Sequence, residues 1–214
     1  MTASSSISDL DRLAAEIRAC RICVERPGGK PLPHEPRPVL RVSSSARLLI
    51  ASQAPGLRVH KSGLPFDDAS GDRLRAWLGM DRETFYDTRL VCIAPMGFCF
   101  PGYDSAGGDL PPRRECAARW HDRLFALLPQ VEAVLVIGGY AHRYHFARLG
   151  KPLAKAAKVD EIVRQWRDFE SATPRLFPLP HPSWRNTGWL KRNPWFESDL
   201  LPDLRAVVKA AISD

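Results

Sequence analysis

The sequence of 214 residues contains no apolar run long enough to cross a membrane and no recognisable secretory leader. Its longest apolar runs, such as AVLVIGG, fall far short of the roughly 20 residues that a transmembrane helix needs. The opening MTASSSISDLDRL does not place an apolar segment after a basic one, as a signal peptide does. We therefore expect a cytoplasmic protein.

Cysteine is scarce, and its count is odd. The chain has five cysteines, which cannot all pair with one another, and disulfides are rare in the cytoplasm. The sequence also lacks internal repeats and long low-complexity segments. Its length suits one α/β domain, so we expect a single domain over residues 1–214.

Acidic residues are outnumbered by basic ones. The 31 Lys and Arg residues against 24 Asp and Glu residues give a formal net charge of +7 at pH 7. A basic protein favours polyanionic partners such as nucleic acids. The same balance also fits a basic soluble protein with no such partner, so charge alone leaves both interpretations open.

Short apolar stretches alternate with amphipathic ones, which predicts a parallel sheet covered by helices on both faces. Strands are expected at RLLIAS, FYDTRLVCIAP, EAVLVIGG and RLFPLP. Ser8 and Ser70 are expected to cap the first two helices. The helices are placed at residues 9–20, 70–80, 113–129, 140–150 and 199–213.

Three loops that follow these strands carry residues suited to a ligand site. SQAPGLRVHKSGLPFDDASG follows the first strand, IAPMGFCFPG ends the second, and HPSWRN follows the last. Ligands of parallel sheets gather beyond the carboxyl ends of the strands. We therefore expect the three loops to meet on one rim of the sheet.

The order of these motifs resembles the uracil-DNA glycosylase superfamily, and most closely its iron–sulfur branch (families 4 and 5). The shared order runs through CxxC, SQAPG, GLPF, CIAP, a later cysteine, VIGG and HPSWRN, nearly the whole chain. The resemblance implies a three-layer α/β/α sandwich with a central four-stranded parallel sheet. It also implies a DNA repair enzyme that flips uracil or a related damaged base out of DNA and hydrolyses its N-glycosidic bond.

The resemblance assigns a base pocket. Phe66 matches the family's stacking position, and His181 matches the histidine that hydrogen-bonds the pyrimidine carbonyl and stabilises developing charge. Core packing for Phe66 and an ordinary loop position for His181 are the alternatives. The SQAPG loop would complete the pocket with a polar contact from Gln53, through its backbone, and with Ala54, Pro55 and Gly56.

Three positions depart from the family pattern. The motif carboxylate is absent from the SQAPG loop. Asp67 and Asp68 lie just beyond this loop and are candidates to replace it, unless they serve only as acids at a helix N-terminus. A gapless alignment puts Arg89 where many members carry a base-reading asparagine, and Ile93 where the third cluster cysteine falls.

Four cysteines are expected to hold a metal centre: Cys20, Cys23, Cys99 and Cys116. The first two form a CxxC, the later two are 17 positions apart, and Cys92 is expected to be buried in its strand. Four thiolates suit a [4Fe–4S] cluster or a structural zinc equally well, and the resemblance favours iron–sulfur. Cysteines without any metal are the remaining alternative.

The segment HPSWRNTGWLKRNPWF interleaves cations, which bind phosphates, with tryptophans, which stack on bases. The resemblance makes Arg185 the residue that wedges into the minor groove. Trp195 is instead expected to anchor the terminal helix in the core, and His142 and His145 to lie on a helix surface. The expected DNA-binding residues are Ser183, Trp184, Arg185, Asn186, Lys191 and Arg192.

The sequence leaves two rival functions open. The missing motif carboxylate is compatible with a non-catalytic or covalent binder of uracil- or abasic-site DNA. A zinc-stabilised nucleotide-binding protein without repair activity is the more remote alternative. In the leading interpretation, the protein is a monomer that acts on DNA and has no membrane partner.

Overall fold

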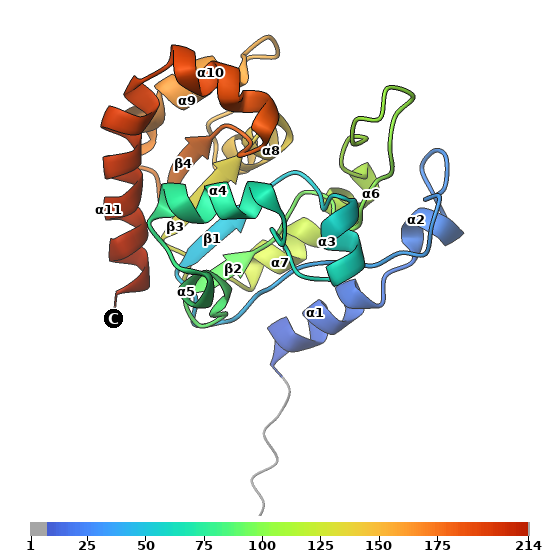
Figure 1. Ribbon diagram of the computed structural model, residues 1–214. Coiled ribbons are helices and arrows are strands. Elements are labelled where there is room, and N and C mark those ends of the chain that lie inside the picture. Colours follow the sequence, from blue (N-terminus) through green and yellow to red (C-terminus); the bar gives the residue numbers. More distant parts are fainter. Residues whose placement is uncertain (1–7, 214) are drawn as a thin grey trace, which may run out of the picture.

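The computed structural model describes residues 8–213, and four parallel strands form its central sheet. The order across the sheet is β2–β1–β3–β4, and the residues of β1, β2 and β3 are all buried. The expected α/β/α sandwich with a four-stranded parallel sheet is confirmed (Figure 1). The strands are β1 (Leu48–Ala51), β2 (Val91–Ile93), β3 (Ala133–Ile137) and β4 (Arg175–Leu179).

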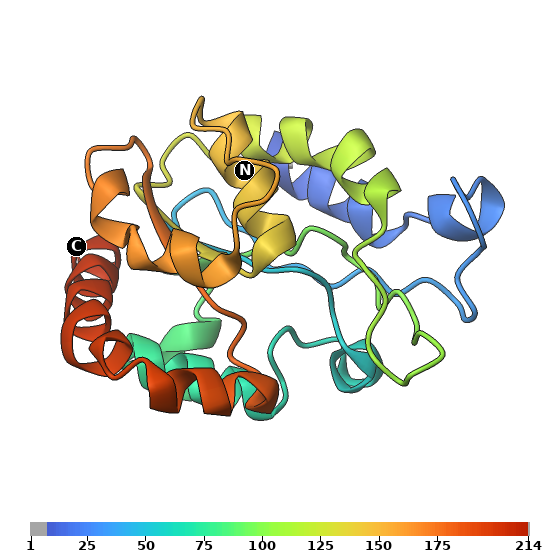
Figure 2. The same cartoon turned by 90° about the horizontal axis from the view of Figure 1, so that it is seen from above.

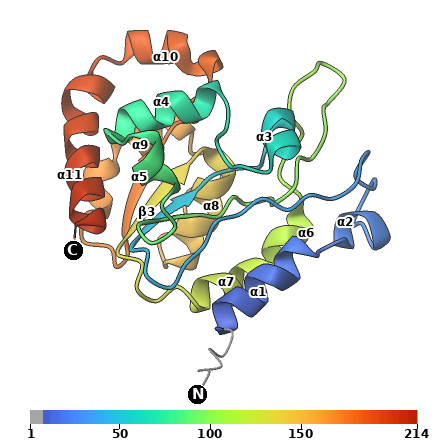
Figure 3. The same ribbon diagram turned by 60° about the horizontal axis from the view of Figure 1, so that its bottom comes forward.

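One face of the sheet packs against α1, α8 and a helix that is continuous through a π-helical turn. Figure 2 shows these helices on one side of the sheet. Figure 3 shows α1 alongside α7, where Arg123 and Glu16 form an ion pair at 2.9 Å. Ser8 caps α1 as expected. The elements are α1 (Asp9–Arg18), α6 (Arg114–Cys116), η1 (Ala117–His121), α7 (Asp122–Ala126) and α8 (Gly139–Arg148).

The opposite face packs against a second helical layer, which includes the terminal helix. Trp77 of α4 meets Phe196 at 4.8 Å between ring centroids, so α4 and the start of the terminal helix share one apolar core. These elements are α4 (Ala69–Leu78), α5 (Arg82–Tyr86), η4 (Phe196–Leu200) and α11 (Leu201–Ile212).

The remaining elements are short and lie in the connections. They are α2 (Ile22–Glu25), α3 (Leu57–Ser62), α9 (Val159–Arg164), η2 (Trp166–Phe169), η3 (Trp184–Asn186) and α10 (Thr187–Arg192). None of the helices within residues 8–213 has the length and apolarity to span a membrane. The expectation of no signal peptide concerns residues that fall partly in 1–7, outside the described part of the chain.

Two expected boundaries are wrong because aspartates upstream start helices. Asp68, not Ser70, caps α4, and its Oδ1 accepts a hydrogen bond from the Gly71 amide at 2.9 Å. Asp81 accepts a hydrogen bond from the Thr84 amide at 2.7 Å and so begins α5, which takes in Phe85 and Tyr86 at the start of the stretch expected as a strand. The strand β2 begins only at Val91 and is three residues long.

The prediction that two histidines lie on a helix surface is also wrong. His142 and His145 of α8 are both fully buried. His142 Nε2 lies 2.9 Å from the Val136 carbonyl oxygen and 3.1 Å from that of Leu179, so it links α8 to β3 and β4. The polar sequence of α8 hides this burial, which the packing of α7 over the helix produces.

Candidate active site

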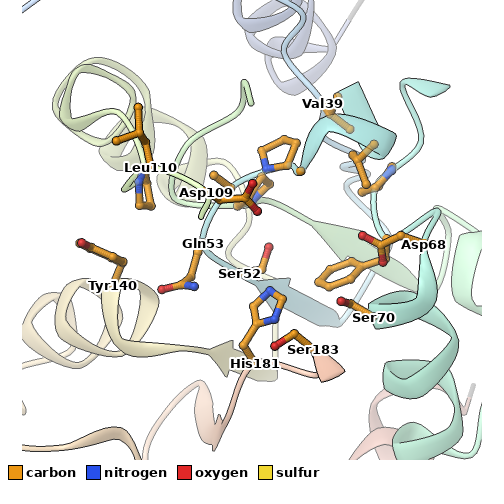
Figure 4. A pocket seen from close by; sticks show the side chains of 18 of the residues that line it. Val39, Ser52, Gln53, Asp68, Ser70, Asp109, Leu110, Tyr140, His181 and Ser183 are labelled. Carbon is orange, nitrogen blue, oxygen red and sulfur yellow. The ribbon is translucent and has the colours of Figure 1, made fainter. Parts of the chain in front are cut away.

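A cavity of about 540 Å³ opens at the carboxyl ends of the strands. Its walls come from the loop after β1, with Gln53 and Gly56, and from the loops after β2 and β4, with Asp109 and His181 (Figure 4). The prediction that three loops share one rim is confirmed. The other predicted residues of the first loop, Ala54 and Pro55, also line the cavity.

Phe66 borders the cavity and belongs to the apolar core at the same time. It is 8% exposed and meets Phe85 edge-on at 6.1 Å between ring centroids. Its φ of 57° is the one positive value among non-glycine residues in 8–213, and this conformation is costly for a bulky residue. Gly71 permits it, because a Cβ there would come within 1.8 Å of the Phe66 carbonyl oxygen.

His181 enters the cavity from the loop after β4, and neighbouring contacts fix that loop. The Asn186 side-chain amide donates a hydrogen bond to the His181 carbonyl oxygen at 2.6 Å. Arg73 of α4 donates to the Ser183 carbonyl oxygen at 2.8 Å. Burial lowers the pKa of His181, against an opposing effect of the Asp68 charge. The imidazole is therefore neutral at pH 7 and has one N–H to donate.

The two candidate aspartates lie in different surroundings. Asp68 lines the cavity, although its Oδ1 also caps α4. Asp67 does not border the cavity, and its carboxylate forms an ion pair with Arg82 at 3.0 Å. The hydrogen bond from Arg82 is the main cause that lowers the pKa of Asp67. The structure thus separates Asp68, which is at the site, from Asp67, which is not.

A third carboxylate, Asp109, was not found from the sequence. It follows two glycines in the loop after β2, and Figure 4 shows it across the cavity from His181. Asp109 is exposed, yet desolvation by the neighbouring walls is the largest cause that raises its pKa; the charges of Asp68 and Asp104 add to the rise, and the charge of Arg185 opposes it. The available signal was an acid in a glycine- and proline-rich loop that follows a strand at the same rim.

Arg89 lies outside the cavity, so its prediction as a base-contacting residue is wrong. It precedes β2, whereas the cavity forms at the carboxyl ends of the strands. Its guanidinium pairs with Asp87 at 2.6 Å. Ile93, at the carboxyl end of the same short strand, lines the cavity. Because β2 begins only at Val91, Arg89 lies at the amino end of the strand, opposite the edge where the cavity forms.

The rim of the cavity carries exposed apolar side chains. Trp184 is 76% exposed, and the Arg185 guanidinium lies 5.9 Å from the centre of its ring. Among residues 8–213, the exposed large hydrophobic residues all line this cavity: Tyr103, Leu110, Tyr140 and Trp184. Asn186 and Ser183 line it too, whereas Lys191 and Arg192 are exposed on α10 beyond the rim.

Trp195 anchors the chain in the core, as expected. Its ring stacks on Trp166 at 5.6 Å between centroids and also contacts Phe196. The tryptophans of one segment therefore divide into an exposed one at the rim and partly buried ones beneath it.

Four of the five cysteines gather where the N-terminal segment meets the loop after β2. The Cys116 thiol donates a hydrogen bond to the Cys23 sulfur, which lowers the pKa of Cys23 to about 7. The pKa of Cys99 is raised to about 12, by burial first and then by the charges of Cys23 and Cys20. The fifth cysteine, Cys92, is buried in β2 as expected.

Polar contacts hold these two segments together. The Glu115 carboxylate accepts a hydrogen bond from the Gly28 amide at 2.8 Å and pairs with Arg113 at 2.7 Å. Arg113 also donates to the Lys30 carbonyl oxygen at 2.8 Å. Within the described residues, no three His, Cys, Asp or Glu side chains are already arranged as a metal-binding group. The side chains that gather are thiols, the donor type of iron–sulfur and structural zinc sites.

Comparison with known families gives one match. The family described as Uracil DNA glycosylase superfamily matches residues 41–205. This range contains all four strands and the three loops that line the cavity. It includes Cys99 and Cys116 but begins after Cys20 and Cys23.

Proposed function

Since the chain belongs to the uracil DNA glycosylase superfamily, we propose that it removes uracil or a related damaged base from DNA by hydrolysing the N-glycosidic bond. The observation that carries this proposal is the pairing of Phe66 and His181 in one cavity, from loops far apart in the sequence. The cavity volume of about 540 Å³ lies within the range of small-molecule sites. A single flipped nucleotide is the ligand that these features suit.

The proposed chemistry follows from the side chains at the cavity. An aromatic ring at Phe66 gives the flipped base an apolar surface to pack on. A neutral imidazole at His181 donates a hydrogen bond to the pyrimidine carbonyl, and this bond strengthens as negative charge develops on the departing base. The Asp68 carboxylate supplies negative charge that stabilises the cationic sugar. Each group acts on a different part of the nucleotide.

The rim supports DNA as the partner. Trp184 exposes an aromatic face that stacks on a base, and Arg185 beside it is placed to fill the space that a flipped nucleotide leaves. Lys191 and Arg192 on α10 are proposed phosphate contacts. The formal net charge of +7 agrees with a polyanionic partner.

We also propose that Cys20, Cys23, Cys99 and Cys116 hold a [4Fe–4S] cluster, with structural zinc as the alternative. The thiol-only donor set fits either centre, and the hydrogen bond between Cys23 and Cys116 supports their convergence. When bound, the centre supplies a cross-link between the N-terminal segment and the loop after β2. No step of the base removal passes through it.

A panel of oligonucleotides, each with one damaged base, tests the function. Cleavage after alkaline treatment identifies a glycosylase and its base, in single- and double-stranded DNA. The matched variant His181→Ala is expected to lose about 100- to 1,000-fold in single-turnover rate while it still binds lesion DNA. If the wild type shifts lesion DNA in a gel but does not cleave it, the protein is a binder of lesion DNA and not a glycosylase. Neither cleavage nor binding would favour a nucleotide-binding protein without repair activity.

A further inference from the structure

Among residues 8–213, three aspartates lie at or near the cavity, and the carboxylate of one of them has no hydrogen-bond partner there. Asp67 is held by Arg82 outside the cavity, and Asp68 Oδ1 accepts the Gly71 amide hydrogen. Among the described residues, none donates a hydrogen bond to the Asp109 carboxylate. Of these three aspartates, Asp109 therefore keeps both carboxylate oxygens available to a ligand, whereas Asp68 keeps one.

The loop that carries Asp109 is ordered by its own backbone. Asp109 forms an antiparallel bridge with Tyr103, and the Leu110 amide donates to the Gly102 carbonyl oxygen at 2.9 Å. Asp104 Oδ1 closes the turn between them by accepting hydrogen bonds from the Ala106 and Gly108 amides at 2.9 and 2.8 Å. The carboxylate is thus presented by a short hairpin.

Asp109 lies over the loop in which the family's motif carboxylate is missing. Its Oδ2 is 3.7 Å from the position that a Cβ on Gly56 would take, so it lies against the SQAPG loop. Figure 4 shows the carboxylate pointing into the cavity, with His181 on the opposite side and Asp68 at a third corner. A ligand bound in the cavity would therefore lie between His181 and Asp109.

We propose that Asp109 is the general base that activates the hydrolytic water, an inference that rests on the glycosylase function proposed above. The C1′–N bond breaks, and its electron pair leaves with the base, whose charge His181 stabilises. The water oxygen bonds to C1′, and its proton passes to the Asp109 carboxylate. The proton then returns to solvent, so atoms and charge balance and no further reactant is needed.

The surrounding charges suit this role. Desolvation by the cavity walls raises the pKa of Asp109, and so do the charges of Asp68 across the cavity and Asp104 on the same hairpin, while the charge of Arg185 at the rim opposes them. A carboxylate with a raised pKa is a stronger base than an ordinary one. Asp68 and Asp109 thus divide the work, one stabilising the sugar cation and the other accepting the proton.

The test compares Asp109→Asn with Asp67→Asn in single-turnover cleavage of an oligonucleotide that the wild type cleaves. Asp109→Asn is nearly isosteric and breaks no hydrogen bond to the carboxylate, so we expect binding of lesion DNA to persist while the rate falls about 100- to 1,000-fold. Asp67→Asn removes an ion pair outside the cavity and should cleave at the wild-type rate. The acidic limb of the pH–rate profile should disappear in Asp109→Asn alone.

Chemical rescue with added formate, a small carboxylate, distinguishes a general base from a residue that only maintains the shape of the loop. Asp109→Ala should regain rate with formate, whereas Asp104→Ala, which loosens the same hairpin, should not. If the wild type cleaves uracil-DNA and Asp109→Asn keeps its rate, the inference is overturned and the glycosylase function stands. Formate rescue of Asp68→Ala in place of Asp109→Ala would also overturn it. A wild type that cleaves no lesion overturns the glycosylase function and this inference together.

Discussion

At the scale of single residues, the base pocket depends on a close backbone contact. Phe66 is held at a φ of 57° by a turn that passes directly against Gly71. Glycine is needed at this position because of space and not because of its own conformation, since Gly71 lies within helix α4. The close approach of the Phe66 carbonyl to Gly71 therefore fixes the backbone that carries the aromatic ring at the cavity.

Gly71→Ala should destabilise the fold and remove base binding together. Alanine is the better helix former, but its Cβ would come within 1.8 Å of the Phe66 carbonyl oxygen. We expect a loss of roughly 2–3 kcal/mol in the free energy of unfolding, measured by urea denaturation. Gly29→Ala is the control, because nothing lies within 4 Å of a Cβ there. Equal stability of the two variants would contradict the contact.

At the scale of elements, the loop after β2 joins the two proposed centres. It begins near Cys99, forms the hairpin with Tyr103 and Asp109, and ends at Cys116 in α6. Pro33 of the N-terminal segment lies 3.3 Å from the position of a Cβ on Gly102. A centre bound by cysteines of both segments would therefore fix both ends of one wall of the cavity.

Cys99→Ser should lose the metal, and Cys92→Ser should keep it. Cys92 is hydrogen-bonded to Ser43 in the core, and no other cysteine is among the groups that shift the pKa of its thiol. Protein purified without oxygen should be brown for the wild type and for Cys92→Ser, with iron measured by elemental analysis. If the wild-type protein is colourless and contains stoichiometric zinc, the metal centre is a zinc site and not an iron–sulfur cluster. Loss of metal from Cys92→Ser would show that the third ligand is Cys92.

Helix α10 should contribute affinity without specificity. Lys191 and Arg192 are exposed, and neither pairs with a carboxylate of residues 8–213. Their joint replacement by alanine should weaken DNA binding for every sequence and reduce the slope of log K against log salt by about 2. The control removes Arg18 and Lys209, exposed cations on α1 and α11. If the two double variants have equal slopes of log K against log salt, the DNA phosphates do not contact Lys191 and Arg192.

At the scale of the whole molecule, buried histidines make stability depend on pH. Burial lowers the pKa of His121 and of His142 to about 4, and that of His145 well below its ordinary value. Both ring nitrogens of His145 lack a hydrogen-bond partner within the described residues. Each imidazole is therefore neutral in the folded protein and binds a proton more readily in the unfolded chain.

Stability should fall as the pH drops from about 6.5 toward about 4. Over this window the unfolded chain binds more protons than the folded one, and each such histidine contributes a slope of up to about 1.4 kcal/mol per pH unit. Urea denaturation at pH 7.5, 6 and 5 measures the slope. His145→Phe, which fits the ring among Phe125 and Tyr144, should reduce it by the contribution of one group. A slope that His145→Phe leaves unchanged would mean that His145 does not titrate on unfolding.

The sequence by itself determined the features that depend on local order. Alternating strands and helices were enough to predict the parallel sheet and the rim where three loops meet, since the carboxyl ends of parallel strands share one edge. The motif order was enough to indicate the superfamily and to bring Phe66 and His181 to the cavity. The sheet, the rim and the motif order all depend on residues close together in the chain or on the direction of a strand.

The tertiary structure decided which polar groups face the cavity. Asp67 and Asp68 are adjacent in sequence, yet Asp67 pairs with Arg82 outside the cavity. Asp68 caps α4 and lies at the cavity wall. Asp109 reaches the same cavity through a hairpin with no motif of its own, and Arg89 lies at the opposite edge because β2 begins only at Val91. Pairing, burial and pKa arise from residues far apart in the chain, so no local pattern fixes them.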